Sequence, residues 1–282
     1  MSTRLPPEVY DRFIDFLHDE RPTLSTCSLV CRSWVHSSQY HLFSNLQIGP
    51  RFQKDPGVFA HSLTTSTGPR ILGFVRTLRI DAGRDEYYLD TALLVSILQK
   101  LNRLQSLRLE GTSLRLEGPI PSSCVKRFRL EELSLPGSDW CRKPQDIDNL
   151  SSLLGMFAHI KKLAIAYSYT NPSPHQFSHV IGEHGTTTTT PSIDSIVILM
   201  GNFQSDYASQ PYDLLSRMCC LDHLRSLAIR LRNSQEVVSL GEFLRSKGST
   251  IEHLELDFWP SEWKNSQSIG QTPLLYCLLP HC

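Results

Sequence analysis

The sequence lacks a net charge and a long apolar run, and its first residues do not have the composition expected of a secretion signal. Lysine and arginine together number 28, as do aspartate and glutamate, so the formal net charge is zero. A chain without a basic excess has no overall field that attracts nucleic acid or an anionic membrane. No apolar run reaches the roughly 20 residues that a membrane-spanning helix needs. Prolines and acids occupy residues 1–8, where a secretion signal would be apolar. We therefore expect a soluble cytoplasmic or nuclear protein with no nucleic-acid or membrane partner.

Signatures of catalysis and cofactor binding are also missing. The sequence has no phosphate-binding loop, no Gly-x-Gly-x-x-Gly and no Gly-x-Ser-x-Gly. His175 and His179 could share one helical face, but no Glu follows His175, as the zinc-hydrolase motif of that spacing requires. Solvated histidines before a flexible loop are the favoured interpretation. We expect no cofactor, no metal site and no catalytic residue.

Cysteines are present but form no framework. The eight residues are scattered, and several interrupt apolar helical patterns, as reduced thiols in a core do. Cys27 and Cys31 have a helical spacing rather than that of a zinc site, and the adjacent Cys219 and Cys220 follow an apolar helix face. We expect no disulfide framework and no metal site at these residues.

The sequence does contain a compact helical unit over residues 1–44. Pro6 and Pro7 suit the first turn of a helix, where the amide that proline lacks would have no partner. From Val9 to Leu17, apolar residues recur at helical spacing and form one apolar face. This pattern predicts the first helix.

A second helix and a shorter third segment follow. Pro22 biases Arg21 away from helical backbone, so we expect Thr23 or Ser25 to cap the second helix. Apolar residues then recur every three or four positions, and the third segment runs to Phe43. The recurring residues are Leu24, Cys27, Val30, Cys31 and Trp34.

These residues belong to a pattern about forty residues long. It reads Leu5-Pro6-x-Glu8, Ile14, Leu17, Leu24, Leu29-Val30-Cys31-Arg32-x-Trp34 and His41-Leu42-Phe43. The pattern resembles the F-box, in particular the F-box proteins of mushroom-forming fungi. The resemblance implies that the unit docks onto the Skp adaptor of a cullin-RING ubiquitin ligase. The adaptor-binding residues that it implies are Leu5, Pro6, Ile14, Leu17, Leu24, Val30, Cys31 and Trp34.

The polar stretch from Thr23 to Ser28 departs from the family pattern by having few acids. The residues by themselves leave an alternative open, in which Leu17, Leu24, Val30 and Trp34 form the core of a small helical bundle.

The rest of the chain repeats a six-residue frame, apolar-x-x-apolar-x-apolar. Seven copies start at Val75, Leu104, Leu130, Ile160, Ile193, Leu224 and Ile251, and an eighth starts at Phe43. The last two apolar positions of a frame point to the same side of a strand, because successive side chains alternate. Helical patterns cover residues 93–101, 150–157, 212–218 and 237–244, whereas residues 114–125 read as an irregular loop. Such units stack into a parallel sheet covered by helices, since none buries its apolar face alone.

This second pattern resembles leucine-rich repeats of the long, irregular kind that follow an F-box in many substrate receptors. The expected fold class is α/β: a small three-helix F-box module over residues 1–44, then an irregular leucine-rich-repeat solenoid of about seven repeats over 45–282. Parallel strands would form its concave face and helices its convex face. Regular repeats carry Asn or Cys eight positions after the frame start, and this chain carries neither there. A generic α/β domain is the alternative.

Positions between the buried ones should face solvent on the concave side. Charge gathers at both ends of this face and its middle is apolar. We expect an apolar floor for a client, with Arg79 and Arg108 at one rim. The floor consists of Ala164, Ala166, Val197 and Leu199. The predicted client-binding residues are Arg79, Arg108, Ala164, Ala166, Val197, Leu199 and Arg230. In the alternative, Val197 and Leu199 belong to a strand that a loop buries on its second face.

The two patterns in this order predict the substrate-recognition subunit of an Skp–cullin–F-box ubiquitin ligase, which is not itself an enzyme. The F-box would bind the Skp adaptor and through it the cullin, and the repeats would present a client protein for ubiquitination and degradation. The alternative is a stand-alone repeat scaffold with an F-box-like cap. Residues 272–280 look like a helix with no strand frame after it, so we expect either a truncated sequence or an apolar lid.

Overall fold

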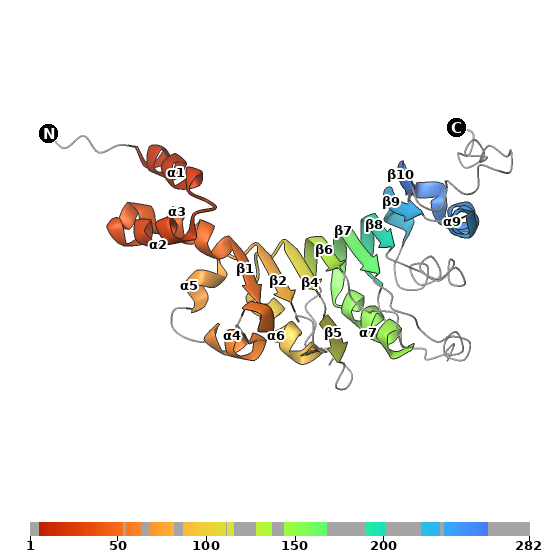
Figure 1. The fold of residues 1–282 in the computed structure, drawn as a ribbon, viewed down its shortest axis with the longest axis horizontal. Helices are drawn as coiled ribbons and strands as arrows, with labels where there is room; N and C mark the ends of the chain where they lie inside the picture. The colour runs from red at the N-terminus through yellow and green to blue at the C-terminus, as the bar shows by residue number, and fades with distance from the viewer. Residues whose placement is uncertain are drawn as a thin grey trace.

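The computed structural model describes residues 6–52, 55–63, 68–81, 87–110, 112–115, 128–136, 144–167, 190–200, 221–231 and 234–258. Over these residues the chain has a mixed α/β fold, in which one parallel sheet of eight strands is accompanied by helices. The sheet follows an arc, with three helices projecting from its first strand and other helices along its outer side (Figure 1). The expected α/β class with a parallel sheet is confirmed.

Three helices open the described chain: α1 (Pro7–Phe16), α2 (Arg21–Val30) and α3 (Arg32–Ser44). Helix α1 begins at the expected proline. Helix α2 begins at Arg21, with Pro22 in its first turn, where proline needs no amide partner. The prediction that Thr23 or Ser25 caps this helix is therefore wrong, since both residues lie inside it.

Cys31 separates α2 from α3. Its backbone is extended, with φ −157° and ψ 161°, and it is the N-cap of α3. The sequence periodicity had placed Cys31 and Trp34 on the second helix, which is wrong because the chain turns at Cys31. The short third segment is instead a helix of 13 residues.

A small core joins these three helices. Ile14 of α1 and Leu24 and Cys27 of α2 are its buried members. Leu17, Trp34 and Leu42 pack against them and are half-buried. The apolar stripe of α1 is thus only partly used inside the unit.

All eight sequence frames form strands of the large sheet, and the strands follow one another in chain order. These strands are β1 (Asn45–Ile48), β2 (Thr77–Asp81), β4 (Ser106–Glu110), β6 (Phe128–Pro136), β7 (Phe157–Tyr167), β8 (Ser192–Met200), β9 (Ser226–Leu231) and β10 (His253–Phe258). The fourth residue of every frame falls into one register: Leu46, Leu78, Leu107, Leu133, Leu163, Ile196, Leu227 and Leu254. The frame therefore predicted both the strands and their alignment.

A second, two-stranded sheet was not predicted. Strand β3 (Tyr87–Asp90) pairs in parallel with β5 (Thr112–Arg115). Residues 114 and 115 are therefore strand rather than loop, while residues 116–125 lie outside the described residues.

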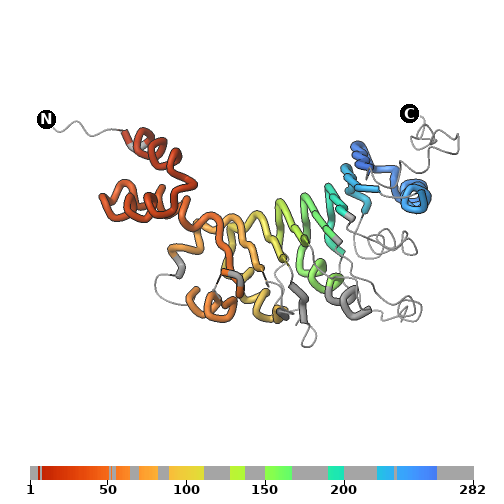
Figure 2. The backbone as a smooth tube through the Cα atoms, in the orientation of Figure 1, coloured from red at the N-terminus to blue at the C-terminus, as the bar shows by residue number. Residues whose placement is uncertain are grey.

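Helices cover one face of the large sheet. They are α4 (Pro56–Ser62), α5 (Gly68–Leu72), α6 (Thr91–Lys100), α7 (Pro144–Gly155) and α9 (Ser234–Lys247), with short 3-10 turns at Pro50–Phe52, Leu221–His223 and Gly248–Thr250. Three of the four predicted helical patterns correspond to α6, α7 and α9, and the fourth, over residues 212–218, lies outside the described residues. One continuous core lies between the sheet and these helices, and it includes Leu98 of α6, Leu153 of α7 and Leu240 of α9. Figure 2 shows that the opposite face of the strands is the inner side of the arc.

Gly49 closes the turn after β1. Its φ is +126°, and a Cβ atom at this position would lie 1.9 Å from the carbonyl oxygen of Asp81. Only glycine accepts both this backbone angle and this close approach. The first two strands are thereby held together just beyond their paired residues.

Candidate binding surfaces

The residues predicted to bind an adaptor differ in how far they are exposed to solvent. Pro6, Val30 and Cys31 are exposed, whereas Ile14 and Leu24 are completely buried and hold the three helices together. The remaining described members, Leu17 and Trp34, are half-buried against that core, and Leu5 lies outside the described residues. The bundle-core alternative thus describes Leu24, and in part Leu17 and Trp34, but not Val30. In this conformation Ile14 and Leu24 offer no surface to a partner.

Other exposed apolar side chains on the same helices were missed. Phe16 and Leu29 each expose 84% of their surface and Val30 exposes 60%, while Phe13 is exposed on α1. Phe13 and Phe16 belong to the apolar stripe of α1, which the sequence pattern treats as inward-facing. Leu29 stands within the F-box-like pattern, beside residues that the pattern assigns. Large apolar side chains exposed on so small a unit, above all the adjacent Leu29 and Val30, indicate a surface for a partner.

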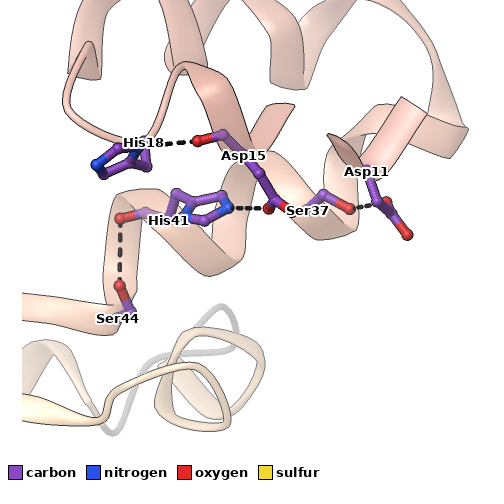
Figure 3. A network of polar contacts seen from close by, with 6 residues as sticks. All are labelled: Asp11, Asp15, His18, Ser37, His41 and Ser44. Carbon is purple, nitrogen blue, oxygen red and sulfur yellow. Dashed lines mark hydrogen bonds and ion pairs between the residues drawn. The ribbon is translucent and has the colours of Figure 1, made fainter. Parts of the chain in front are cut away.

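A line of polar contacts fixes α1 against α3 (Figure 3). Ser37 Oγ donates to the carboxylate of Asp11, and His41 Nε2 lies 2.7 Å from Asp15 Oδ1. Both partners advance by four residues, so the two helices run parallel along this line. His18 Nδ1 donates to the carbonyl oxygen of Asp15 at 2.8 Å, where α1 ends. These contacts determine how α1 presents its exposed phenylalanines.

Cys31 carries an exposed thiol at the N-terminus of α3. Its Sγ lies 3.0 Å from Ser33 Oγ. The hydrogen bond from the Ser33 side chain lowers the pKa of the Cys31 thiol below its usual range; desolvation opposes this shift, and the backbone N–H groups of Trp34 and Ser33 support it. Hydrogen bonds to the thiolate and the positive end of a helix both favour the charged form. Cys27 is a free thiol as well, but it is buried.

The inner face of the sheet carries the predicted client-binding residues. On this face, the fifth residue of every frame lies in one line across the eight strands, because the strand register aligns these residues. We call this line of side chains the outer row. Its members are Gln47, Arg79, Arg108, Ser134, Ala164, Val197, Ala228 and Glu255. Ala164, Ala166, Val197 and Leu199 form the apolar floor, which spans β7 and β8. Leu199 exposes 42% of its surface, so the alternative in which a loop buries this strand on both faces is wrong.

The three arginines predicted to bind a client form ion pairs with carboxylates of the same chain, to different extents. Arg79 contacts the carboxylates of Asp81 and Glu110, and its guanidinium lies 5.5 Å from the centre of the Phe52 ring. Arg230 Nε lies 2.6 Å from Asp257 Oδ2 on the next strand. Arg108 has a single, longer contact, 3.4 Å from Nε to Glu110 Oε2. Arg79 and Arg230 therefore mainly stabilise the contact between neighbouring strands.

A serine, a histidine and an aspartate meet at the start of β8. His159 Nδ1 lies 2.9 Å from Ser192 Oγ, and its Nε2 lies 3.5 Å from Asp194 Oδ2. These are the residue types of a hydrolase triad. However, Ser192 Oγ also lies within 3.4 Å of the Ala158 carbonyl, so a backbone acceptor competes with the imidazole for the hydroxyl proton. The arrangement works as a brace between β7 and β8.

Among the described residues, no group of three or more His, Cys, Asp or Glu side chains could hold a metal ion. His175 and His179 lie outside the described residues. Within the described part of the chain, no helix has the length and apolar character needed to cross a membrane.

Comparison with models of known protein families gives no match, and no curated protein matches the sequence. The fold defines the class of the molecule as a mixed α/β protein with a curved parallel sheet and a three-helix unit at one end. The surfaces described above carry the functional argument.

Proposed function

We propose that this chain is the substrate-recognition subunit of a cullin-RING ubiquitin ligase of the Skp–cullin–F-box type. The three helices α1 to α3 dock onto the Skp adaptor as an F-box, and the sheet, as part of a leucine-rich-repeat solenoid, binds a client protein. The chain itself catalyses nothing, and the other ligase subunits carry out the transfer of ubiquitin.

The exposed apolar side chains of the helical unit carry this proposal. Phe16, Leu29 and Val30 lie largely in water, although they belong to a unit whose own core is small. Covering a side chain of this size is favourable by about 1.5–3 kcal/mol, so a partner that buries the adjacent Leu29 and Val30 gains several kcal/mol. This surface coincides with the segment whose sequence resembles the F-box.

The junction between the helices and the sheet also fits a receptor. Helix α3 ends at Ser44 and β1 begins at the next residue, so no linker separates them. The Arg76 amide donates to the Ser44 carbonyl at 2.9 Å, and the rings of His36 and Phe74 meet edge to face at 5.2 Å. A direct junction of this kind limits how far a bound client could move relative to the adaptor.

The same joint supports a second candidate, the stand-alone scaffold. The three helices lie at the β1 end of the sheet, where a stack of strands needs its last apolar face covered (Figure 1). In this case the helices would serve only as a cap, and their exposed side chains would bind no adaptor.

Binding of the purified Skp adaptor to the full chain distinguishes the two functions. We expect co-elution in gel filtration, and at least about tenfold weaker binding by the double variant Leu29→Ser, Val30→Ser. Val58→Ser on α4 is the matched control, because Val58 is as exposed but lies on the helical side of the sheet. A folded chain that binds no adaptor would refute the ligase function and favour the scaffold instead.

A further inference from the structure

The outer row changes from one charge to the other across the sheet, with an uncharged centre. Ser134, Ala164, Val197 and Ala228 occupy four neighbouring strands, and none of them is larger than valine. The next positions along β6, β7 and β8 hold Pro136, Ala166 and Leu199, which are apolar. The apolar floor is thus two side-chain rows deep.

One charged side chain on each side of the uncharged centre of the outer row, Arg108 and Glu255, is available to a partner. On β4, Arg108 leaves 45% of its side chain exposed, because Arg79 is the main partner of both nearby carboxylates. On β10, Glu255 is exposed and has no ion-pair partner among the described residues, since Asp257 beside it is taken by Arg230. A cation and an anion therefore bound the uncharged floor.

The distance from β4 to β10 matches the length of a short helix. Five strand spacings separate β4 from β10, which amounts to about 24 Å at about 4.8 Å each. An α-helix rises 1.5 Å per residue, so about 16 residues, or four to five turns, cover this span.

The floor selects a helix over an extended segment. The sheet's own backbone groups are already paired between strands, and the side chains of Ala164, Val197 and Leu199 offer no hydrogen bonds. An extended segment lying across them would bury backbone N–H and C=O groups without partners, which is strongly unfavourable. A helix satisfies these groups internally and presents only side chains.

We propose that the inner face of this sheet binds an amphipathic α-helix of a protein partner, with an acidic residue near one end and a basic residue near the other. The acidic end contacts Arg108 and the basic end contacts Glu255, while the apolar side of the helix lies on Val197 and Leu199. An acid at the N-terminus and a base at the C-terminus also suit the helix dipole, so the helix runs from β4 toward β10. This inference deepens the proposed function by naming the class of client, and it concerns a surface separate from α1 to α3.

Charge reversals at the two ends test this surface with synthetic peptides of about 18 residues. The three fluorescent peptides share one leucine face. The first carries Glu near its N-terminus and Lys near its C-terminus, the second carries Glu at both ends and the third carries Lys at both ends. The full chain should prefer the first peptide, E255K should prefer the second and R108E the third. Each preference should amount to about three- to tenfold in Kd, as expected for exposed charges at the rim of an interface.

Matched reversals on α9 serve as controls, because Glu242 and Arg245 are exposed on the helical side of the sheet. E242K and R245E should leave the order of the three peptides unchanged, and Leu199→Ser should weaken all three. Absence of saturable binding, an order that E255K and R108E do not change, or an order that E242K changes equally would overturn the inference. Adaptor binding is measured on the same samples. A chain that binds the adaptor but does not discriminate the peptides refutes only the helix site, whereas the reverse result refutes only the ligase.

Discussion

The imidazole of His41 on α3 lies 2.7 Å from the carboxylate of Asp15 on α1 and joins the first helix to the third. His41 leaves only 16% of its side chain exposed, while Asp15 is largely in water. Since α1 carries Phe13 and Phe16 on its outer side, this contact controls how the proposed adaptor surface is presented.

Loss of the Asp15 contact should loosen α1. We expect Asp15→Ala and His41→Ala each to lower the free energy of unfolding by about 1 kcal/mol, because a partly exposed side-chain hydrogen bond contributes little more than that. Amide hydrogen exchange should accelerate in α1 more than in the sheet. A double-mutant cycle measures the coupling, which should be about 0.5–1 kcal/mol. Additive effects of the two substitutions would show that the contact does not hold the helices together.

Gly49→Ala should destabilise the chain strongly. The new Cβ would need to move away from the Asp81 carbonyl, 1.9 Å distant, at a backbone angle that alanine rarely adopts. We expect a loss of about 2–4 kcal/mol in chemical denaturation. Gly155→Ala is the control, because, apart from its chain neighbours and the backbone of its own helix, no atom lies within 4 Å of its Cβ position at the end of α7. The control should be neutral or slightly stabilising, and equal losses in both variants would refute the assignment of the turn.

Ile198 and Leu199 are neighbours on β8 that face opposite sides of the sheet. Ile198 is completely buried in the core, whereas Leu199 is exposed on the inner face. Ile198→Ala should lower the free energy of unfolding by about 2–5 kcal/mol, and Leu199→Ala by less than about 1 kcal/mol. Urea titrations of both variants check this difference. A comparable loss for Leu199→Ala would mean that the inner face is covered in solution.

The Cys31 thiol should react readily near neutral pH. Because the Ser33 hydroxyl and backbone N–H groups lower the pKa of this thiol, its thiolate forms at lower pH than that of an ordinary cysteine. Alkylation by iodoacetamide, followed by mass spectrometry of each peptide, should show Cys31 reacting well before the buried Cys27. Ser33→Ala should shift the pH profile of the Cys31 reaction upward. An unchanged profile would show that the hydroxyl does not stabilise the thiolate.

The sheet was predictable because its signal is periodic. Each frame places two apolar residues on one side of a strand, and aligning the eight frames position by position keeps Leu78, Leu107 and their equivalents buried together. The same rule left the alternate positions outside, so the apolar floor could be named from the sequence.

Contacts that depend on individual side chains could not be predicted. The stripe of α1 is apolar on a wide face, and nothing in its spacing shows that Ile14 turns inward while Phe16 stays in water. The predicted start of α2 was wrong. Proline disfavours helical backbone at the residue before it, but it is tolerated in the first turn of a helix, where Pro22 lies. The pairing of Arg79 with Asp81 and Glu110 depends on rotamers across two strands, which a linear pattern does not encode.

The central claim is that α1 to α3 bind the Skp adaptor, and calorimetric titration of the full chain with purified adaptor tests it most directly. We predict saturable one-to-one binding with a negative heat-capacity change, because apolar side chains leave water. Both the affinity and the heat-capacity change should fall in the Leu29→Ser, Val30→Ser variant and stay unchanged in Val58→Ser. A folded chain that shows no binding, or binding that the double variant leaves intact, would contradict the account.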